Sequence, residues 1–119
     1  MVIIELKSGK EAAFNLTYAE LLEITLEHGG VGFTDEVKNK VATRDALYMH
    51  RLMKEIILRS YGIRYGEIFM KSPLSTAMFE NTNDLYEVLT IILSDEKISK
   101  SFMDCLMSDS RYRIRRKNK

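Results

Sequence analysis

The chain has 119 residues, with 18 Lys plus Arg, 17 Asp plus Glu, one Cys, one Pro and no Trp. This length supports one domain with a single modest core, and an apolar fraction of 45% is typical of an ordinary folded protein. No apolar stretch is long enough to span a membrane, and the first residues lack the pattern of a secretory signal. One cysteine cannot form an internal disulfide, so a reducing cytoplasm is the expected compartment.

The net charge of +1 combines two regions of opposite sign. Six basic side chains and no acidic one lie in the last nine residues, which leaves 12 positive and 17 negative side chains in residues 1–110, a net charge of −5. We therefore expect a single domain over residues 1–110 and a basic tail over residues 111–119. The cations of this tail are Arg111, Arg113, Arg115, Arg116, Lys117 and Lys119.

The first third of the chain predicts a β-hairpin followed by helices. Residues 2–6 and 11–16 have strand character, and Lys7-Ser8-Gly9-Lys10 is typical of the turn between them. Thr17 and Glu20 have the spacing of a capping box, which begins a helix that Gly29-Gly30 ends. One face of this helix is expected to carry Tyr18, Leu21, Leu22, Thr25 and Leu26. A second helix, the longest, is predicted from residue 34 to about residue 61.

The second half predicts three further helices. Residues 63–71 form a loop or a short hairpin, and Ser72-Pro73 begins a helix that continues to about Glu80. Asn83-Asp84 begins the next helix and Ser94-Asp95 the last one. The predicted fold is mainly α with a small N-terminal β-hairpin (α+β), a compact helical domain of about four to five helices.

The residue types that carry catalysis are scattered. His28 and His50 stand in no metal-ligand spacing, and Cys105 falls at a core position beside Asp104, which disfavours a reactive thiolate. The glycines at 29–32 lack the strand and the Gly-Lys-Ser/Thr ending of a phosphate loop. We therefore predict a protein that is not an enzyme, with no cofactor and no metal.

Methionine is the most informative residue type. Six of the seven methionines lie on predicted apolar faces, namely Met49, Met53, Met70, Met78, Met103 and Met107. They either fill a core or line an adaptable groove that captures an amphipathic helix, because unbranched side chains repack easily.

Four short motifs after residue 58 resemble the tail assembly chaperones of long-tailed (siphovirus-type) bacteriophages. They are Arg59-Ser60-Tyr61-Gly62, Phe69-Met70-Lys71-Ser72-Pro73, Phe79-Glu80-Asn81-Thr82 and Leu85-Tyr86-Glu87-Val88-Leu89. The resemblance extends over about residues 58–107. It departs from the family pattern at Pro73-Leu74, where an acidic residue often intervenes, and at Asn83-Asp84-Leu85, where Glu-Ala is frequent.

The resemblance implies a chaperone that coats the phage tape-measure protein in the host cytoplasm and keeps it soluble. Such a protein recruits tail-tube subunits and leaves before the virion matures. Self-association is also expected. The candidate contact residues are Met49, Leu52, Met53, Ile56, Tyr61, Phe69, Phe79 and Tyr86, some of which must instead form the core.

Two alternatives remain open at this point. The first alternative to a chaperone is a tail connector or completion protein that stays in the virion. The second is a small regulator that binds nucleic acid through its basic tail. The short tail on an acidic body disfavours nucleic acid as a partner. Arg116-Lys117-Asn118 is also compatible with a slippery run of adenines, so the family's habit of ribosomal frameshifting is a hypothesis for this gene.

Overall fold

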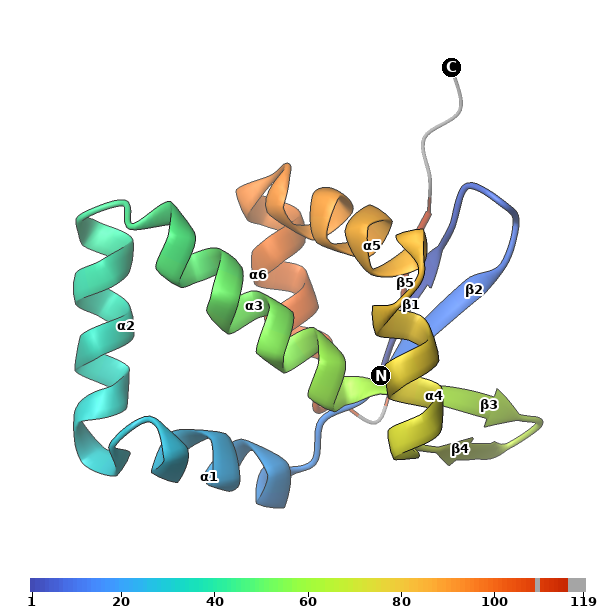
Figure 1. The fold of residues 1–119 in the computed structure, drawn as a ribbon, viewed down its shortest axis with the longest axis horizontal. Helices are drawn as coiled ribbons and strands as arrows, with labels where there is room; N and C mark the ends of the chain where they lie inside the picture. Colours follow the sequence, from blue (N-terminus) through green and yellow to red (C-terminus); the bar gives the residue numbers. More distant parts are fainter. Residues whose placement is uncertain (109, 116–119) are drawn as a thin grey trace.

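The structure, a computed structural model, describes residues 1–108 and 110–115. In chain order its elements are β1 (Val2–Glu5), β2 (Glu11–Phe14), α1 (Tyr18–Glu27), the short 3-10 helix η1 (Gly30–Gly32), α2 (Phe33–Ala42), α3 (Ala46–Ser60), β3 (Tyr61–Tyr65), β4 (Ile68–Met70), α4 (Pro73–Glu80), α5 (Asn83–Leu93), α6 (Glu96–Cys105) and β5 (Tyr112–Ile114). Figure 1 shows α1, α2 and α3 as three sides of a frame, with the sheet at the other end of the molecule.

The strands form one mixed sheet in the order β4-β3-β2-β1-β5. Neighbouring strands run antiparallel, except that β1 and β5 are parallel. The predicted fold of a small N-terminal hairpin with four to five helices is therefore wrong, because the described residues form six α-helices and a five-stranded sheet. Strands β3 and β4 form the short hairpin that is one of the two alternatives for residues 63–71. Strand β5 is three residues long, too short for a clear alternating pattern in the sequence.

Strand β5 comes from the segment that the sequence marks as a basic tail. Tyr112 and Ile114 pack against the core, and Arg113 lies between them and is exposed. The high charge of the segment hid this alternation. Residues 116–119 of that tail lie outside the described residues, so the boundary at residue 110 stays a prediction.

The local signals near the N-terminus are confirmed. β1 and β2 pair in register from Val2↔Phe14 to Glu5↔Glu11. The capping box is also present: the Glu20 backbone N–H donates to the Thr17 hydroxyl at 3.1 Å, and the Glu20 carboxylate accepts from the Thr17 N–H at 2.9 Å. These contacts fix where α1 begins.

The prediction of one long second helix is wrong, because a turn separates α2 from α3. Arg44 adopts a left-handed backbone with φ of 56°, which no helix continues through. Asp45 then caps α3, its carboxylate accepting the Tyr48 N–H at 3.0 Å. In α2, Phe33 is the only buried residue.

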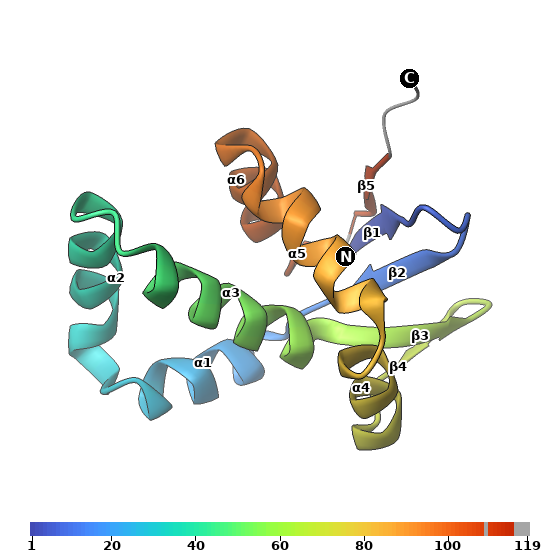
Figure 2. The ribbon, with the colours of Figure 1, turned by 45° about the horizontal axis from the view of Figure 1, so that its top comes forward.

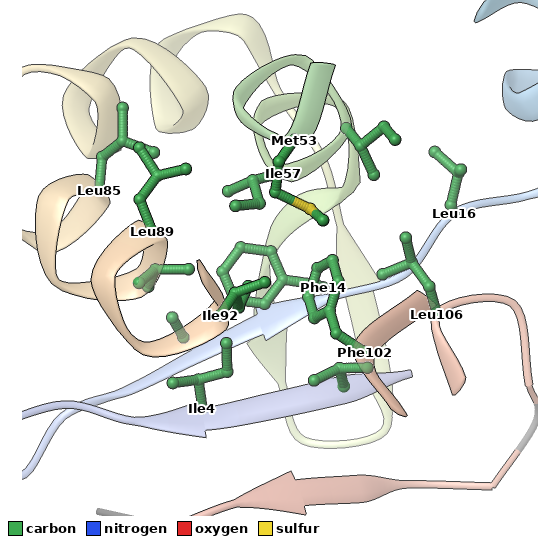
Figure 3. Close-up of a cluster of buried hydrophobic side chains, with 14 of the residues drawn as sticks. Ile4, Phe14, Leu16, Met53, Ile57, Leu85, Leu89, Ile92, Phe102 and Leu106 are labelled. Atoms are coloured by element: carbon green, nitrogen blue, oxygen red, sulfur yellow. The ribbon is translucent and has the colours of Figure 1, made fainter. Parts of the chain in front are cut away.

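The core lies between the sheet and the surrounding helices (Figures 2 and 3). Phe14 of β2 stands near its centre and makes edge-to-face contacts with Tyr61, Phe79 and Phe102, with ring centroids 5.8–6.0 Å apart. These four rings come from β2, β3, α4 and α6, so a single aromatic cluster joins the sheet to two helices.

Candidate partner-binding surface

Ser60-Tyr61-Gly62 joins the longest helix, α3, to strand β3 of the sheet. The buried Ser60 hydroxyl donates to the Ile56 carbonyl at 2.8 Å, which satisfies it at the last turn of α3. The next residue begins β3, and the Tyr61 ring stacks on Phe79 of α4 with centroids 4.1 Å apart. The motif thus fixes α4 against the strand that leaves α3.

Gly62 allows the β3–β4 hairpin to close. A methyl group at Gly62 would lie 2.8 Å from the Met70 carbonyl oxygen and closer still to the Phe69 ring. The Phe69 ring therefore occupies the space that any other side chain would fill. Gly62 and Phe69 thus lie on one face of the hairpin.

The opposite face of the hairpin and the neighbouring helix expose large apolar side chains. Tyr65 and Ile68 are register partners and are 60% and 61% exposed, and Met70, two residues after Ile68, is 54% exposed. On α4, Leu74 and Met78 lie one turn apart and are similarly exposed. We call Tyr65, Ile68, Met70, Leu74 and Met78 the hairpin–α4 surface; both ribbon views place the hairpin beside α4 (Figures 1 and 2).

Polar contacts stabilise the segment between β4 and α4, next to this surface. The Ser72 hydroxyl accepts the Ser75 N–H at 3.1 Å and caps α4, with Pro73 as the first helical residue. Lys71, between β4 and α4, forms an ion pair with Glu20 of α1. Burial opposes the charge of Glu20, but hydrogen bonds from Lys71 and from the Thr17 backbone outweigh it and hold the pKa of Glu20 below its usual value. The first turn of α1 is thereby tied to the hairpin–α4 surface.

The candidate residues on α3 lie mostly in the core. Leu52, Met53 and Ile56 are 6–7% exposed and belong to the buried cluster. Met49 is partly buried and lines a hollow with Val41 of α2, Leu93 of α5 and residues of α3 and α6. The broad apolar face that the sequence shows on α3 is therefore largely used within the chain.

The candidates in the matched segment are buried or partly buried, with one exception. Phe79 is 4% exposed, and Tyr61 and Phe69 are partly buried. Their sequence neighbours Ile68, Met70 and Met78 are the exposed residues. Only Tyr86, on α5, is exposed among these four candidates. A strand or helix turns adjacent residues to different faces, and the motifs alone do not say which face is solvent.

The described part of the basic tail is partly neutralised. Arg113 forms an ion pair with Glu11 of β2, and Arg111 lies 3.6 Å from the Glu67 carboxylate. Arg115 is exposed. Arg116, Lys117 and Lys119 lie outside the described residues.

The two histidines and the cysteine lie in different surroundings. The His28 ring bonds the Glu55 carboxylate at 2.8 Å and stacks on Phe33, while His50 is exposed and Cys105 is partly buried. The described residues bring together no group of three potential metal ligands. Within the same residues, no helix is both long and apolar enough to cross a membrane.

Residues 5–111 match the model of a protein family described as phage tail assembly chaperones. The match covers most of the chain, so the protein belongs to this family. No curated protein and no solved structure matches the chain. Membership gives the protein a non-enzymatic role in phage tail assembly within the host cell, through binding of phage tail proteins.

Proposed function

We propose that the protein binds the phage tape-measure protein through the hairpin–α4 surface and keeps it soluble in the host cytoplasm until tail-tube subunits assemble around it. The observation that carries this proposal is a group of five large apolar side chains, between 54% and 71% exposed, within the short segment 65–78. Soluble monomers rarely expose such groups without a partner.

The chemistry of the surface suits a long apolar helix. Met70 and Met78 adapt their shape to different neighbours, which a chaperone needs because successive turns of its client differ in sequence. Leu74 and Tyr65 add apolar area that an amphipathic helix can cover. The backbone beneath is fixed by the Tyr61–Phe79 stack and the Ser72 cap, so little conformational entropy is lost on binding.

Recruitment of tail-tube subunits and departure from the mature virion belong to the same proposal. The ion pairs of Arg111 and Arg113 with carboxylates of the same chain weigh against a nucleic-acid role for the tail. A frameshifted longer form remains a hypothesis for Arg116-Lys117-Asn118; a gene without a slippery run at these codons contradicts it.

Co-expression with the tape-measure protein of the same phage tests the proposal. The wild-type chain should bring the tape-measure protein into the soluble fraction and co-purify with it. The double variant Met70→Glu/Met78→Glu should lose both effects, because two carboxylates cannot be buried against an apolar helix. Val31→Glu is the matched control, since Val31 is 99% exposed and lies outside the surface.

Unchanged co-purification of the double variant contradicts the choice of surface. Failure of the wild-type chain to keep the tape-measure protein soluble contradicts the function itself. So does a fixed copy number of the protein in mature virions, which a connector would show.

A further inference from the structure

Helix α1 carries an exposed apolar stripe that the proposed function does not use. Tyr18, Leu22 and Leu26 are 76%, 58% and 63% exposed and follow one another at a spacing of four residues. We call these three residues the α1 stripe. The sequence predicts them on one face of this helix together with Leu21 and Thr25. In the structure Leu21 and Thr25 are partly covered, and Ile24 is the buried residue of α1. The apolar content of α1 exceeds what its own core contact uses.

The α1 stripe lies on an acidic helix. Glu20, Glu23 and Glu27 are the charged residues of α1, which has no Lys or Arg. The Glu23 side chain is 67% exposed, and its position next to Leu22 places a carboxylate at the border of the stripe. A partner for this surface needs apolar side chains accompanied by positive charge.

The outer face of α3 has this complementary chemistry. Leu47, Arg51, Lys54 and Leu58 follow one another at intervals of four, three and four residues, so they share one side of the helix. A shallow hollow there is lined by Arg51, Lys54, Glu55, Leu58 and Arg59. The Glu55 carboxylate is paired with Arg59 and His28, so the three basic side chains of the hollow outnumber its one carboxylate. Leu58 and the stems of the basic residues supply its apolar surface. Lys54 meets only the distant Glu80 carboxylate at 3.8 Å, and Arg51 forms no ion pair with the described residues.

The two surfaces lie next to each other in one chain. The Arg59 guanidinium of α3 contacts the Glu27 carboxylate and lies 4.0 Å from that of Glu23. His28 at the end of α1 bonds Glu55 of α3. A surface with an apolar–acidic half and an apolar–basic half side by side is self-complementary about a twofold axis.

We propose that a second copy of this chain covers the α1 stripe. In the dimer, the Tyr18, Leu22 and Leu26 side chains of one copy lie in the hollow on α3 of the other. Glu23 of each copy faces Arg51 and Lys54 of its partner, and the twofold axis repeats the contact. The hairpin–α4 surface stays outside this interface, so a dimer presents two such surfaces to one tape-measure helix.

Sedimentation of the purified full-length chain, without tape-measure protein, tests the dimer. The wild type should dimerise at micromolar concentration. Leu22→Glu should raise the dimer dissociation constant at least about tenfold, because it places a carboxylate in the hollow. Val31→Glu, which adds the same charge at an exposed apolar site outside the stripe, should leave the constant unchanged.

A charge exchange tests the pairing of α1 with α3. Glu23→Arg and Arg51→Glu should each weaken the dimer by creating like-charge contacts, and the double variant should restore it. Circular dichroism of each variant verifies that the fold is kept. A monomeric wild type, or a Leu22→Glu variant that dimerises as the wild type does, overturns the proposal. Loss of tape-measure binding by Leu22→Glu with a monomeric wild type would instead assign the stripe to the tape-measure protein.

Discussion

At the scale of single residues, the matched motifs place a missing side chain and a hydrogen-bonded hydroxyl group at the point where α3 continues into β3. Gly62 leaves room for the Phe69 ring, and the Ser60 hydroxyl bonds back to its own helix. Neither residue offers a surface to a partner, since both are buried. Their role is to hold the backbone that presents the hairpin–α4 surface.

Gly62→Ala should therefore destabilise the chain by about 1–3 kcal/mol, because the added methyl group collides with the Phe69 ring and the Met70 carbonyl. Urea unfolding followed by circular dichroism measures this change. Gly32→Ala is the control: its φ is −76° and a methyl group there meets nothing within 4 Å, so no loss of stability is expected. Equal effects at the two sites would argue against the close approach at Gly62.

The lowered pKa of Glu20 gives a pH dependence with a definite sign. A carboxyl group whose pKa is lower in the folded state stabilises the fold above its unfolded pKa of about 4.5, and this contribution disappears as the pH falls through the lowered folded-state value. Glu20→Gln removes the titration. The wild type should lose stability more steeply than the variant between about pH 6 and about pH 3. Parallel unfolding curves over that range would show that the Lys71 and Thr17 contacts do not favour the charged form.

At the scale of elements, signals within a few residues were predictable and contacts between distant segments were not. The capping box of α1, the Ser72-Pro73 start of α4 and the Asp95 start of α6 depend on neighbouring residues, and all are present. The position of β5 beside β1 depends on residues more than 100 positions apart, which no local pattern encodes.

The division between α2 and α3 shows how a short signal can be overlooked. Apolar residues continue at helical spacing on both sides of Thr43-Arg44-Asp45, so periodicity alone favours one helix. The Asp45 cap depends on the left-handed turn at Arg44, which this periodicity does not indicate.

Asp45→Ala should lower the free energy of unfolding, because the Tyr48 N–H loses its acceptor. Asp45→Asn keeps an acceptor oxygen at the same place and removes the charge near Lys40. Thermal or urea unfolding should rank the wild type and Asn close together and Ala clearly below. An Asn variant as unstable as Ala would mean that the charge, and not the cap, starts α3.

At the scale of the whole molecule, one aromatic cluster unites the sheet and the helices. Phe14 is fully buried and contacts three other rings from separate elements. Figure 3 shows Phe14 beside Phe102 among the buried side chains of the core. The sequence motifs direct attention to the segment after Ser60, although four of the eight candidate residues lie before it. The exposed members of this segment could not be predicted, because exposure depends on how α4 and the hairpin pack on this cluster.

Phe14→Ala should cost about 3–5 kcal/mol, since it opens a cavity where four elements meet. Tyr65→Ala, at a side chain that is 60% exposed, should change stability by less than about 0.5 kcal/mol. Chemical unfolding of both variants measures the difference. A small loss at Phe14 would place the centre of the core elsewhere.

The most direct test of the central claim is a photo-crosslinking amino acid introduced at Met78 or at Tyr86 and activated in cells that co-express the tape-measure protein. Both positions are well exposed, but only Met78 belongs to the hairpin–α4 surface. The account predicts a covalent adduct with the tape-measure protein from position 78 and little or none from position 86. An adduct from position 86 alone would contradict the assignment of the tape-measure protein to this surface.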